Sequence, residues 1–324
     1  MTAGKYVHRK RHLYRQPKRT LGLRSAADNL DLRLKDFRIV HIGRVASGVL
    51  SPERRASILG TTSRGVYLSL FAGWVIFLST ERYRGPLTLN VQGSDDVMQP
   101  FETGMPVKIN ERSIDLPGAG KRFYIDQAEI WQVPPALPAA VLPVEQRRKQ
   151  LMEIIQQLSS KQKNSSFAGL IPELLENKGR ASTQSNDLNQ RLDNMRMALL
   201  ERNIADLVNA ASAILGLGAG LTPAGDDLIA GLMLVLNRWG SFLAPDLDVE
   251  ALNQTIIRLA YIKTTRLSAN LIECACLGQA DERLVLALDG LLTGEPEAGQ
   301  CAAYLAGWGN TSGLDALAGM ALVL

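Results

Sequence analysis

A glycine-rich segment contains the residues of this sequence that are best suited to chemistry. Residues 216–227 read Gly-Leu-Gly-Ala-Gly-Leu-Thr-Pro-Ala-Gly-Asp-Asp and join two apolar stretches. Alternating glycines allow positive φ angles and a close approach of the backbone to a ligand, and their amides can surround an anion. The glycines predicted to bind a small anionic substrate in this way are Gly216, Gly218, Gly220 and Gly225.

The second half of this segment predicts the start of a helix. Thr222 is suited to cap the helix with its hydroxyl, and Pro223 suits the first helical position. Asp226 and Asp227 then lie in the first turn, where carboxylates can bind a magnesium ion that bridges to a phosphate. We therefore predict Thr222 and Asp227 as catalytic residues and the two aspartates as magnesium ligands. The alternative is a glycine-lined crossing of close-packed helices, with the aspartates as caps.

A second segment, close to the end of the sequence, repeats this pattern. Residues 307–315 read Gly-Trp-Gly-Asn-Thr-Ser-Gly-Leu-Asp. When residues 225–231 are aligned with residues 313–319, glycine, aspartate, alanine and glycine coincide at four of seven positions. We predict that the two loops face each other and form one site, with Asp227 and Asp315 as catalytic groups; the alternative is a chance similarity of two helix starts. The substrate-binding residues predicted here are Thr311, Ser312 and Gly313.

Hydroxyl groups are also concentrated between the two loops. Residues 264–268 read Thr-Thr-Arg-Leu-Ser, and Ser268 is predicted to contact the substrate. The apolar spacing around this segment predicts one helix over residues 252–277. An ordinary surface helix is therefore the alternative interpretation of the segment.

The rest of the sequence divides into a β-rich part and a helical part. Short runs of β-branched and aromatic residues in residues 37–133 predict an open sheet or a small barrel. Prolines crowd into residues 134–144 and predict a linker, whereas residues 145–324 show helical periodicity. The predicted fold class is α+β, with a β-rich N-terminal domain and a larger, mostly α-helical C-terminal domain.

Several smaller features of these two parts are specific enough to test. Hairpin turns are predicted at residues 72–73 and 111–112, and a helix buried on every side at residues 228–236. The polar residues 159–187 predict a mobile connection or a helical excursion on the surface.

Composition and charge exclude several other classes of protein. Of the 36 basic residues, seven lie in residues 1–20, which contain no acid, and the remaining 29 are balanced by 32 acidic residues. We therefore predict a flexible basic arm over residues 1–36 and no nucleic-acid-binding surface on the body. No apolar run is long enough to cross a membrane. Three cysteines and three histidines are too few for a disulfide framework, a His-based zinc site or a Ser-His-Asp triad.

The hydroxyl- and glycine-rich segments together resemble a known family. Its hallmark is Gly-x-Gly-x-Gly-Leu-Thr-Pro-x-Gly-Asp-Asp, which is intact in residues 216–227. A threonine-rich stretch ending in serine is similar to residues 264–268, a closing segment is similar to residues 309–315, and a Gly-Pro strand entry is similar to residues 85–86. The sequence thus resembles, over roughly residues 37–324, the family that includes the H subunit of oxamate carbamoyltransferase.

This resemblance implies a function in the anaerobic breakdown of allantoin, a nitrogen source that derives from purines. Oxamate carbamoyltransferase interconverts oxalurate and phosphate with oxamate and carbamoyl phosphate. Its H subunit works together with two other subunits. The resemblance therefore implies a cytoplasmic transferase subunit that binds one of these small anions and is active only with partner subunits. The alternative function is a non-catalytic assembly or small-anion-binding subunit of a multi-subunit metabolic complex.

Overall fold

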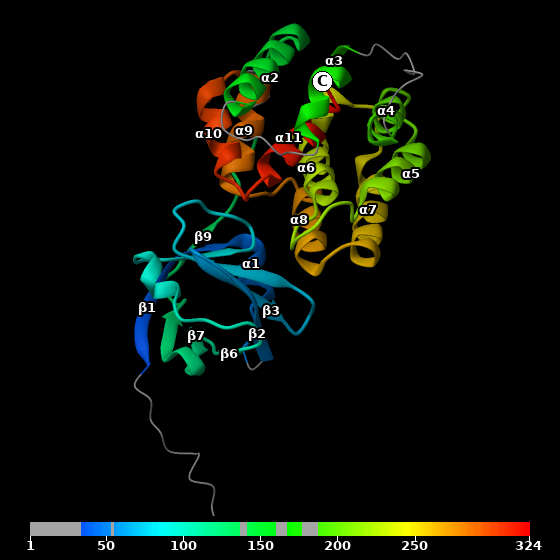
Figure 1. Cartoon of the computed structure of the whole chain (residues 1–324). Helices are drawn as coiled ribbons and strands as arrows, with labels where there is room; N and C mark the ends of the chain where they lie inside the picture. Colours follow the sequence, from blue (N-terminus) through cyan, green and yellow to red (C-terminus); the bar gives the residue numbers. More distant parts are fainter. Residues whose placement is uncertain (1–33, 53–54, 137–140, 160–166, 177–186) are drawn as a thin grey trace, which may run out of the picture. The chain divides into compact units, whose positions relative to one another are not determined.

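The computed structural model describes residues 34–52, 55–136, 141–159, 167–176 and 187–324 (Figure 1). Residues 34–324 form one compact unit. The basic residues 1–20 of the predicted arm lie outside the described residues, as do residues 160–166 and 177–186 of the predicted polar connection.

The β-rich part is a ring of strands. Its strands are β1 (Lys35–Gly43), β2 (Arg55–Thr62), β3 (Gly65–Leu70), β4 (Val75–Ser79), β5 (Thr88–Val91), β6 (Pro106–Ile109), β7 (Ser113–Leu116), β8 (Lys121–Tyr124) and β9 (Glu129–Trp131). Neighbours pair in the order β5-β4-β3-β2-β6-β7-β8-β1-β9, and β5 also pairs with β1. This additional pairing closes the sheet, and a short helix, α1 (Arg44–Val49), follows β1.

Alternating burial along the strands explains why the ring has a core. In β6, Val107 and Ile109 are buried while the residues beside them are exposed. Ile39, Leu68 and Phe123 are fully buried on three other strands. Inward side chains of a closed sheet meet in one interior, which removes apolar surface from water. The small barrel, rather than the open sheet, is therefore the architecture that this part adopts.

Both predicted hairpin turns are confirmed. Gly73 has a φ of 83° and lies in the turn between β3 and β4, which pair antiparallel. The β6 and β7 strands pair across residues 110–112, with Ile109 opposite Ile114. The Gly73 conformation is one that residues with a Cβ rarely adopt, which explains the glycine at this turn.

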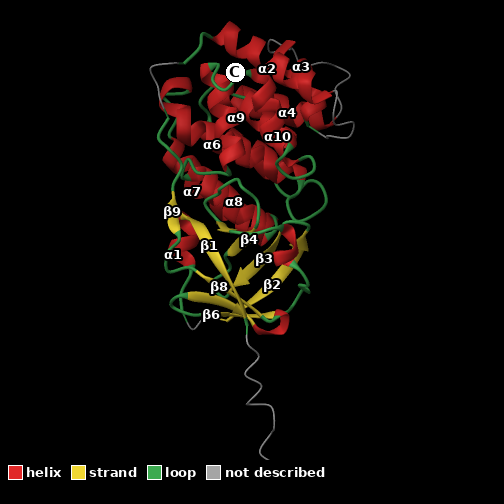
Figure 2. Ribbon diagram, turned by 90° about the vertical axis from the view of Figure 1, so that its left-hand side faces the viewer, coloured by secondary structure: helices red, strands yellow, loops and turns green. Residues whose placement is uncertain are grey.

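Helices form the C-terminal part, as the predicted fold class requires (Figure 2). They are α2 (Val144–Ser159), α3 (Ile171–Glu176), α4 (Asp187–Leu200), α5 (Ile204–Ile214), α6 (Ala224–Leu243), α7 (Val249–Lys263), α8 (Arg266–Cys276), α9 (Glu282–Thr293), α10 (Ala298–Ala306) and α11 (Ser312–Ala321). Residues 225–236 of α6 are all buried, as the apolar pattern predicts. Helix α6 packs against α11 and α8 and therefore lies at the centre of this core.

One helix prediction is wrong in a way that bears on the site. The single helix expected over residues 252–277 is two helices, α7 and α8, which are separated at Thr264 and Thr265. Thr264 has an extended backbone, and the Thr265 side chain caps α8 by accepting a hydrogen bond from the Ser268 amide. Apolar periodicity continues across such a break because both helices bury the same kind of face.

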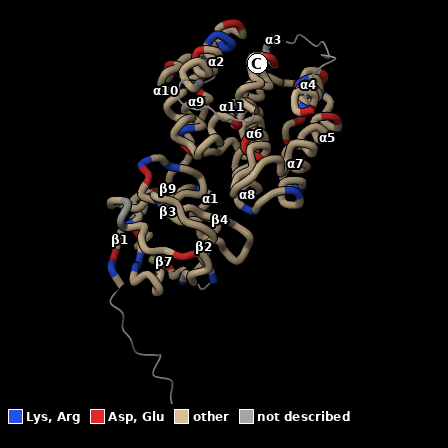
Figure 3. Tube along the Cα trace, in the orientation of Figure 1, with Lys and Arg blue, Asp and Glu red and all other residues tan. Residues whose placement is uncertain are grey.

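Charge is distributed over both parts of the molecule. Figure 3 shows basic and acidic residues on both the barrel and the helices. Within the described ranges, no helix has the length and apolar character needed to span a membrane.

Candidate functional site

The two glycine-rich loops lie against each other, as their similarity predicts. The Thr222 hydroxyl of the first loop is 3.3 Å from the Ser312 hydroxyl of the second. Thr222 precedes α6 and Ser312 begins α11, so the contact joins the N-terminal ends of two packed helices. The juxtaposition of the two loops is therefore confirmed.

The crossing of α6 and α11 is reciprocal, and glycines make it close. A Cβ on Gly231 would lie 2.0 Å from the carbonyl oxygen of Ala316. A Cβ on Gly319 would lie 1.9 Å from the carbonyl oxygen of Leu228. In the alignment of residues 225–231 with 313–319, Gly231 matches Gly319 and Leu228 matches Ala316. The repeated pattern thus corresponds to a local pseudo-twofold arrangement in space.

The other pair of matched glycines also has a packing role. A Cβ on Gly225 would lie 2.2 Å from the Ile214 carbonyl oxygen, at the end of α5. A Cβ on Gly313 would lie 2.0 Å from the Leu305 carbonyl oxygen, near the end of α10. Both glycines are buried, and each allows a helix start to approach the preceding helix. Gly225 and Gly313 therefore pack against the backbone of the preceding helices. Their role in substrate binding stays a prediction.

Asp226 holds the first glycine loop in place. Its side chain is 1% exposed, and its Oδ1 atom accepts a hydrogen bond of 2.8 Å from the Gly216 amide. Its Oδ2 atom accepts a hydrogen bond from the Thr264 hydroxyl at the break between α7 and α8. Buried carboxylates are stable only with such partners, so Asp226 ties the loop to that break.

The remaining loop glycines have the backbone conformation that the sequence predicts. The φ angles of Gly216, Gly218 and Gly220 are 82°, 115° and 100°. Gly218 and Gly220 are exposed, whereas the Gly216 amide is already engaged by Asp226. The exposed pair therefore forms the outer part of this loop.

Hydroxyl groups of the segment 264–268 contact the backbone of the same loop. The Thr265 hydroxyl donates a hydrogen bond of 2.6 Å to the Leu221 carbonyl oxygen. The Ser268 hydroxyl lies 3.5 Å from the same oxygen, and its side chain is buried. Together with Thr264, these hydroxyls position the loop; direct substrate contact by Ser268 stays a prediction.

The start of α6 differs by one residue from the prediction. Pro223, not Thr222, is the N-cap residue, and its carbonyl oxygen accepts hydrogen bonds from the Asp226 and Asp227 amides. The predicted cap fails because proline, with φ −53° and ψ 144°, itself makes the turn into the helix. The Thr222 hydroxyl consequently contacts Ser312 and the Asp227 side chain and does not cap the backbone amides of α6.

Asp227 is a buried carboxyl group directly behind these two hydroxyls. It is 2% exposed. Burial raises its pKa to about 8; the neighbouring charges of Asp315 and Asp226 also raise the pKa, whereas hydrogen bonds from Ser312 and Thr222 lower it. A carboxyl group with a pKa near neutrality can both accept and donate a proton, which is the property that general acid–base catalysis needs.

Asp315, the counterpart of Asp227, is fully buried. Its Oδ1 atom accepts a hydrogen bond of 3.2 Å from the Phe167 amide, which precedes a short 3-10 helix, η4 (Ala168–Leu170). Thr311 lies at the N-cap of α11 and accepts hydrogen bonds there through its carbonyl oxygen. Asp315 therefore affects Asp227 through its charge, and its Oδ1 atom is bound on the side of η4.

A cavity of about 430 Å³ opens where the two loops meet the barrel. Thr222 and Ser312 line it from the helical side, and residues of β2 to β5 line it from the barrel side. Its ionisable and hydroxyl-bearing lining includes Arg64, Tyr67, Glu81, Thr222, Asp281, Arg283 and Ser312. Its volume is in the range typical of small-molecule sites, which are concave and carry a few convergent polar groups.

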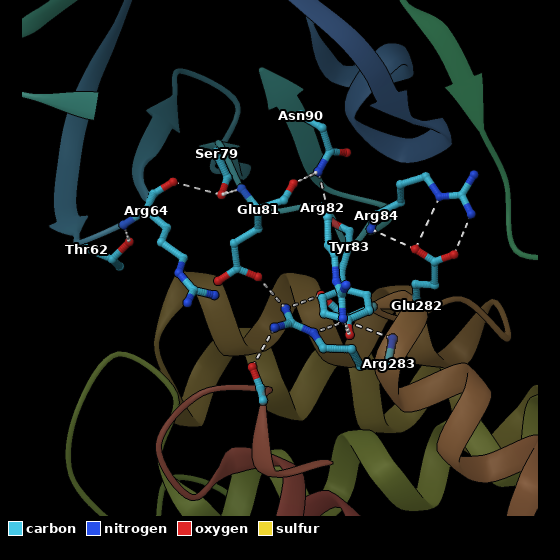
Figure 4. Close-up of polar contacts among 12 residues, drawn as sticks. Thr62, Arg64, Ser79, Glu81, Arg82, Tyr83, Arg84, Asn90, Glu282 and Arg283 are labelled. Atoms are coloured by element: carbon cyan, nitrogen blue, oxygen red, sulfur yellow. Dashed lines mark hydrogen bonds and ion pairs between the residues drawn. The ribbon is translucent and has the colours of Figure 1, made fainter. Parts of the chain in front are cut away.

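Direct contacts between the barrel and the helices hold together the two parts that line this cavity. The Val75 amide of β4 donates a hydrogen bond of 2.8 Å to the Asn270 side chain of α8. Arg84 pairs with Glu282 at the start of α9 through its guanidinium and its amide (Figure 4). Such buried or half-buried polar contacts fix the geometry of two packed surfaces more strictly than apolar contacts do.

Arg283 on the cavity wall contacts both the helical part and the barrel. It donates two hydrogen bonds to Asp281 and one, of 2.5 Å, to the Gly307 carbonyl oxygen. It also forms an ion pair of 2.9 Å with Glu81 and lies over the ring of Tyr83 (Figure 4). Arg283 therefore links the second loop to the barrel.

Tyr67 adds a neutral hydroxyl to the cavity. Its ring stacks on Phe77 at 4.6 Å between centroids. Burial raises its pKa, and the charges of Glu81, Asp281 and Asp227 raise it further, against an opposite effect of Arg283. The phenol stays protonated at neutral pH and can donate a hydrogen bond to a ligand.

The barrel residues of the cavity were missed by the sequence analysis. Arg64, Tyr67 and Glu81 lie far from the glycine loops in the sequence, and no spacing rule connects them. The Gly-Pro strand entry was the available signal, since Gly85 and Pro86 both line the cavity.

The described residues contain no group of three or more His, Cys, Asp and Glu side chains arranged to hold a metal ion. Both oxygens of Asp226 already accept hydrogen bonds, so magnesium binding by Asp226 and Asp227 stays a prediction. Cys274, Cys276 and Cys301 are free and buried, and burial raises the pKa of each thiol.

A comparison with known families identifies the helical core that carries these loops. Residues 214–324 match the family model of the oxamate carbamoyltransferase subunit AllH. The match confirms the predicted resemblance over a region that contains both glycine loops and helices α6 to α11. No curated protein and no solved structure matches the chain. The barrel lies outside the matched region, so its contribution to the cavity is known from the structure alone.

Proposed function

We propose that this chain is a subunit of a carbamoyltransferase that interconverts oxalurate and phosphate with oxamate and carbamoyl phosphate. The observation that carries the proposal is the convergence of Thr222 and Ser312 on one cavity, with the buried Asp227 behind them. The family match over residues 214–324 supports the reaction class. In this proposal the chain works in the cytoplasm with other carbamoyltransferase subunits, in the breakdown of allantoin.

The proposed reaction needs one proton transfer. The amide nitrogen of oxamate attacks the carbonyl carbon of carbamoyl phosphate, a carbon–nitrogen bond forms, and the carbon–oxygen bond to phosphate breaks. Phosphate leaves with the bonding electron pair. The proton from the nitrogen passes through the Ser312 hydroxyl to Asp227, which hydrogen bonds to that hydroxyl. Tyr67 donates a hydrogen bond to the developing negative charge, and the Thr222 hydroxyl positions the Asp227 carboxylate.

Two measurements test this function. The first is a thermal-shift series with phosphate, carbamoyl phosphate, oxamate and oxalurate, each with and without magnesium, because a ligand that binds the folded form raises the unfolding midpoint. The second is phosphate-dependent cleavage of oxalurate by the complex of this chain with its co-purified partners. We expect Asp227→Asn to lower kcat by about 100-fold or more, since general acid–base groups contribute on this scale. The unfolding midpoint should not fall.

Asp246→Asn is the matched control, because Asp246 is an exposed carboxylate of the helical part that does not line the cavity. The pH profile adds a further readout. Since the carboxylate form of Asp227 accepts the proton and its pKa is raised to about 8, kcat should fall with decreasing pH below 8. If no ligand stabilises the wild-type protein and Asp227→Asn complexes react normally, the chain is an assembly subunit.

A further inference from the structure

We propose that Arg64, at the tip of the β2–β3 hairpin, binds the anionic group of the substrate in the cavity, so that the barrel completes the site of the helical part. This inference rests on the proposed function and extends it to a substrate-binding residue. The backbone and the side chain of Arg64 differ in how they are held by the rest of the protein.

The backbone of Arg64 is held firmly. Its amide donates a hydrogen bond of 3.2 Å to the Thr62 hydroxyl, and its carbonyl oxygen accepts hydrogen bonds from the Ser79 hydroxyl, at 2.9 Å, and from the amide and hydroxyl of Thr80. The next residue, Gly65, lies so close to β4 that a Cβ there would be 2.5 Å from the Leu78 carbonyl oxygen. The hairpin tip is therefore preorganised against β4.

The guanidinium of Arg64, in contrast, forms no hydrogen bond or ion pair with any of the residues that the structure describes. The neighbouring arginines differ in this respect: Arg84 pairs with Glu282, Arg283 pairs with two carboxylates, and Arg82 contacts Tyr83. Figure 4 shows the Arg64 side chain leaving the hairpin and extending toward the helical part. Arg64 lines the cavity, so its charge is directed into that space.

The other charged side chains among the described residues that line the cavity are already paired with each other, so Arg64 is the cation that can bind an anionic ligand. Both wall carboxylates, Glu81 and Asp281, are bound to Arg283, which is thereby occupied. The hydroxyls of Thr222 and Ser312 line the opposite wall. A guanidinium can bind a carboxylate or a phosphate through two parallel hydrogen bonds, a geometry that lysine cannot reproduce. The substrate class is thus a small molecule with a carboxylate or phosphate group at one end.

The test compares anion binding by four forms of the full chain. Dissociation constants for inorganic phosphate and for oxamate are measured by titration calorimetry with the wild type, Arg64→Gln, Arg64→Lys and Arg82→Gln. Arg82 is the matched control, because it is an exposed arginine of the same region that does not line the cavity. The ligand whose affinity falls more in Arg64→Gln identifies whether carboxylate or phosphate is bound by this residue.

We expect Arg64→Gln to weaken binding of one anion by roughly 10- to 100-fold, the range for a hydrogen bond to a charged group. Arg64→Lys should give an intermediate loss, and Arg82→Gln should bind like the wild type. The unfolding midpoint of Arg64→Gln without ligand should be unchanged, because the guanidinium has no partner among the described residues to lose. Equal anion affinity in wild type and Arg64→Gln would overturn the inference and leave the proposed function standing. If the wild type binds neither anion, the inference is wrong, and the activity of the Asp227→Asn complex then decides the proposed function.

Discussion

The helix pairs α5–α6 and α10–α11 have the same glycines, aspartate and alanine at matching positions, yet they carry different polar groups. In both pairs a glycine allows the helix start to contact a preceding helix, and a second glycine allows α6 and α11 to cross closely. The position of Asp226 is Leu314 in the second pair, where the side chain is buried and apolar. The shared glycines thus follow from helix packing, and the differing residues determine the chemistry.

The two matched aspartates, Asp227 and Asp315, likewise occupy equivalent positions but have different polar contacts. Asp227 contacts hydroxyls that line the cavity, whereas Asp315 accepts a hydrogen bond from the Phe167 amide. Asp315 nevertheless contributes to the first loop, because its charge raises the pKa of Asp227. Both loops therefore line the cavity, through Thr222 and Ser312, but only Asp227 of the two matched aspartates contacts the hydroxyls of that lining.

The largest effect expected from this comparison is a pH dependence of stability. The pKa of Asp227 is 3.8 in its ordinary state and about 8 in the folded protein, so the folded state retains a proton that the unfolded state releases. The stabilisation is fully present below about pH 4 and is lost as the pH rises to about 8, by up to about 1.4 kcal/mol per pH unit, or ~4 kcal/mol between pH 5 and pH 8.

Urea unfolding at several pH values measures this loss. Asp227→Asn should flatten the profile in that window, because asparagine does not titrate. Asp226→Asn should keep the slope and lower stability throughout, since its carboxylate accepts hydrogen bonds from Gly216 and Thr264. An unchanged slope in Asp227→Asn would show that this carboxyl group is ionised in the folded protein and would remove the argument for a proton acceptor.

A second prediction concerns the close crossing of α6 and α11. Gly319→Ala should cost about 3 kcal/mol of stability, because its Cβ would lie 1.9 Å from the Leu228 carbonyl oxygen and α6 and α11 would have to separate. Gly299→Ala in α10 is the control, because a Cβ there meets no atom within 4 Å and should change stability by less than about 1 kcal/mol. Similar urea-unfolding curves for both variants would contradict the close crossing.

A third prediction concerns the feature that the second pair lacks. Thr264→Val removes the hydroxyl that donates to the buried Asp226 and should lower stability by about 1–2 kcal/mol. Thr255→Val is the matched control in α7, where the hydroxyl donates only to the Ala251 carbonyl oxygen of its own helix. Equal stability of the two variants would mean that Asp226 does not depend on the α7–α8 break.

Much of the fold was predictable because it follows from local patterns. The turn at Gly73, the buried α6 and the division into strands and helices all reflect residue preferences or periodicity within a short stretch. The break at Thr264 was not predictable in this way, since the apolar period continues through it. Its reason lies in a contact with Asp226, which is distant in the sequence.

Local sequence patterns were sufficient to locate the two glycine loops and their similarity, because glycine spacing and a helix start are local properties. It also indicated Asp227, Thr222 and Ser312 as site residues, a role that the tests above address. Only the tertiary structure assigned Asp226 and the threonines to holding the loop, and only it brought Arg64, Tyr67 and Glu81 to the cavity. The physical reason is that barrel closure and helix crossing join residues through burial and hydrogen bonding, and neither follows from sequence spacing.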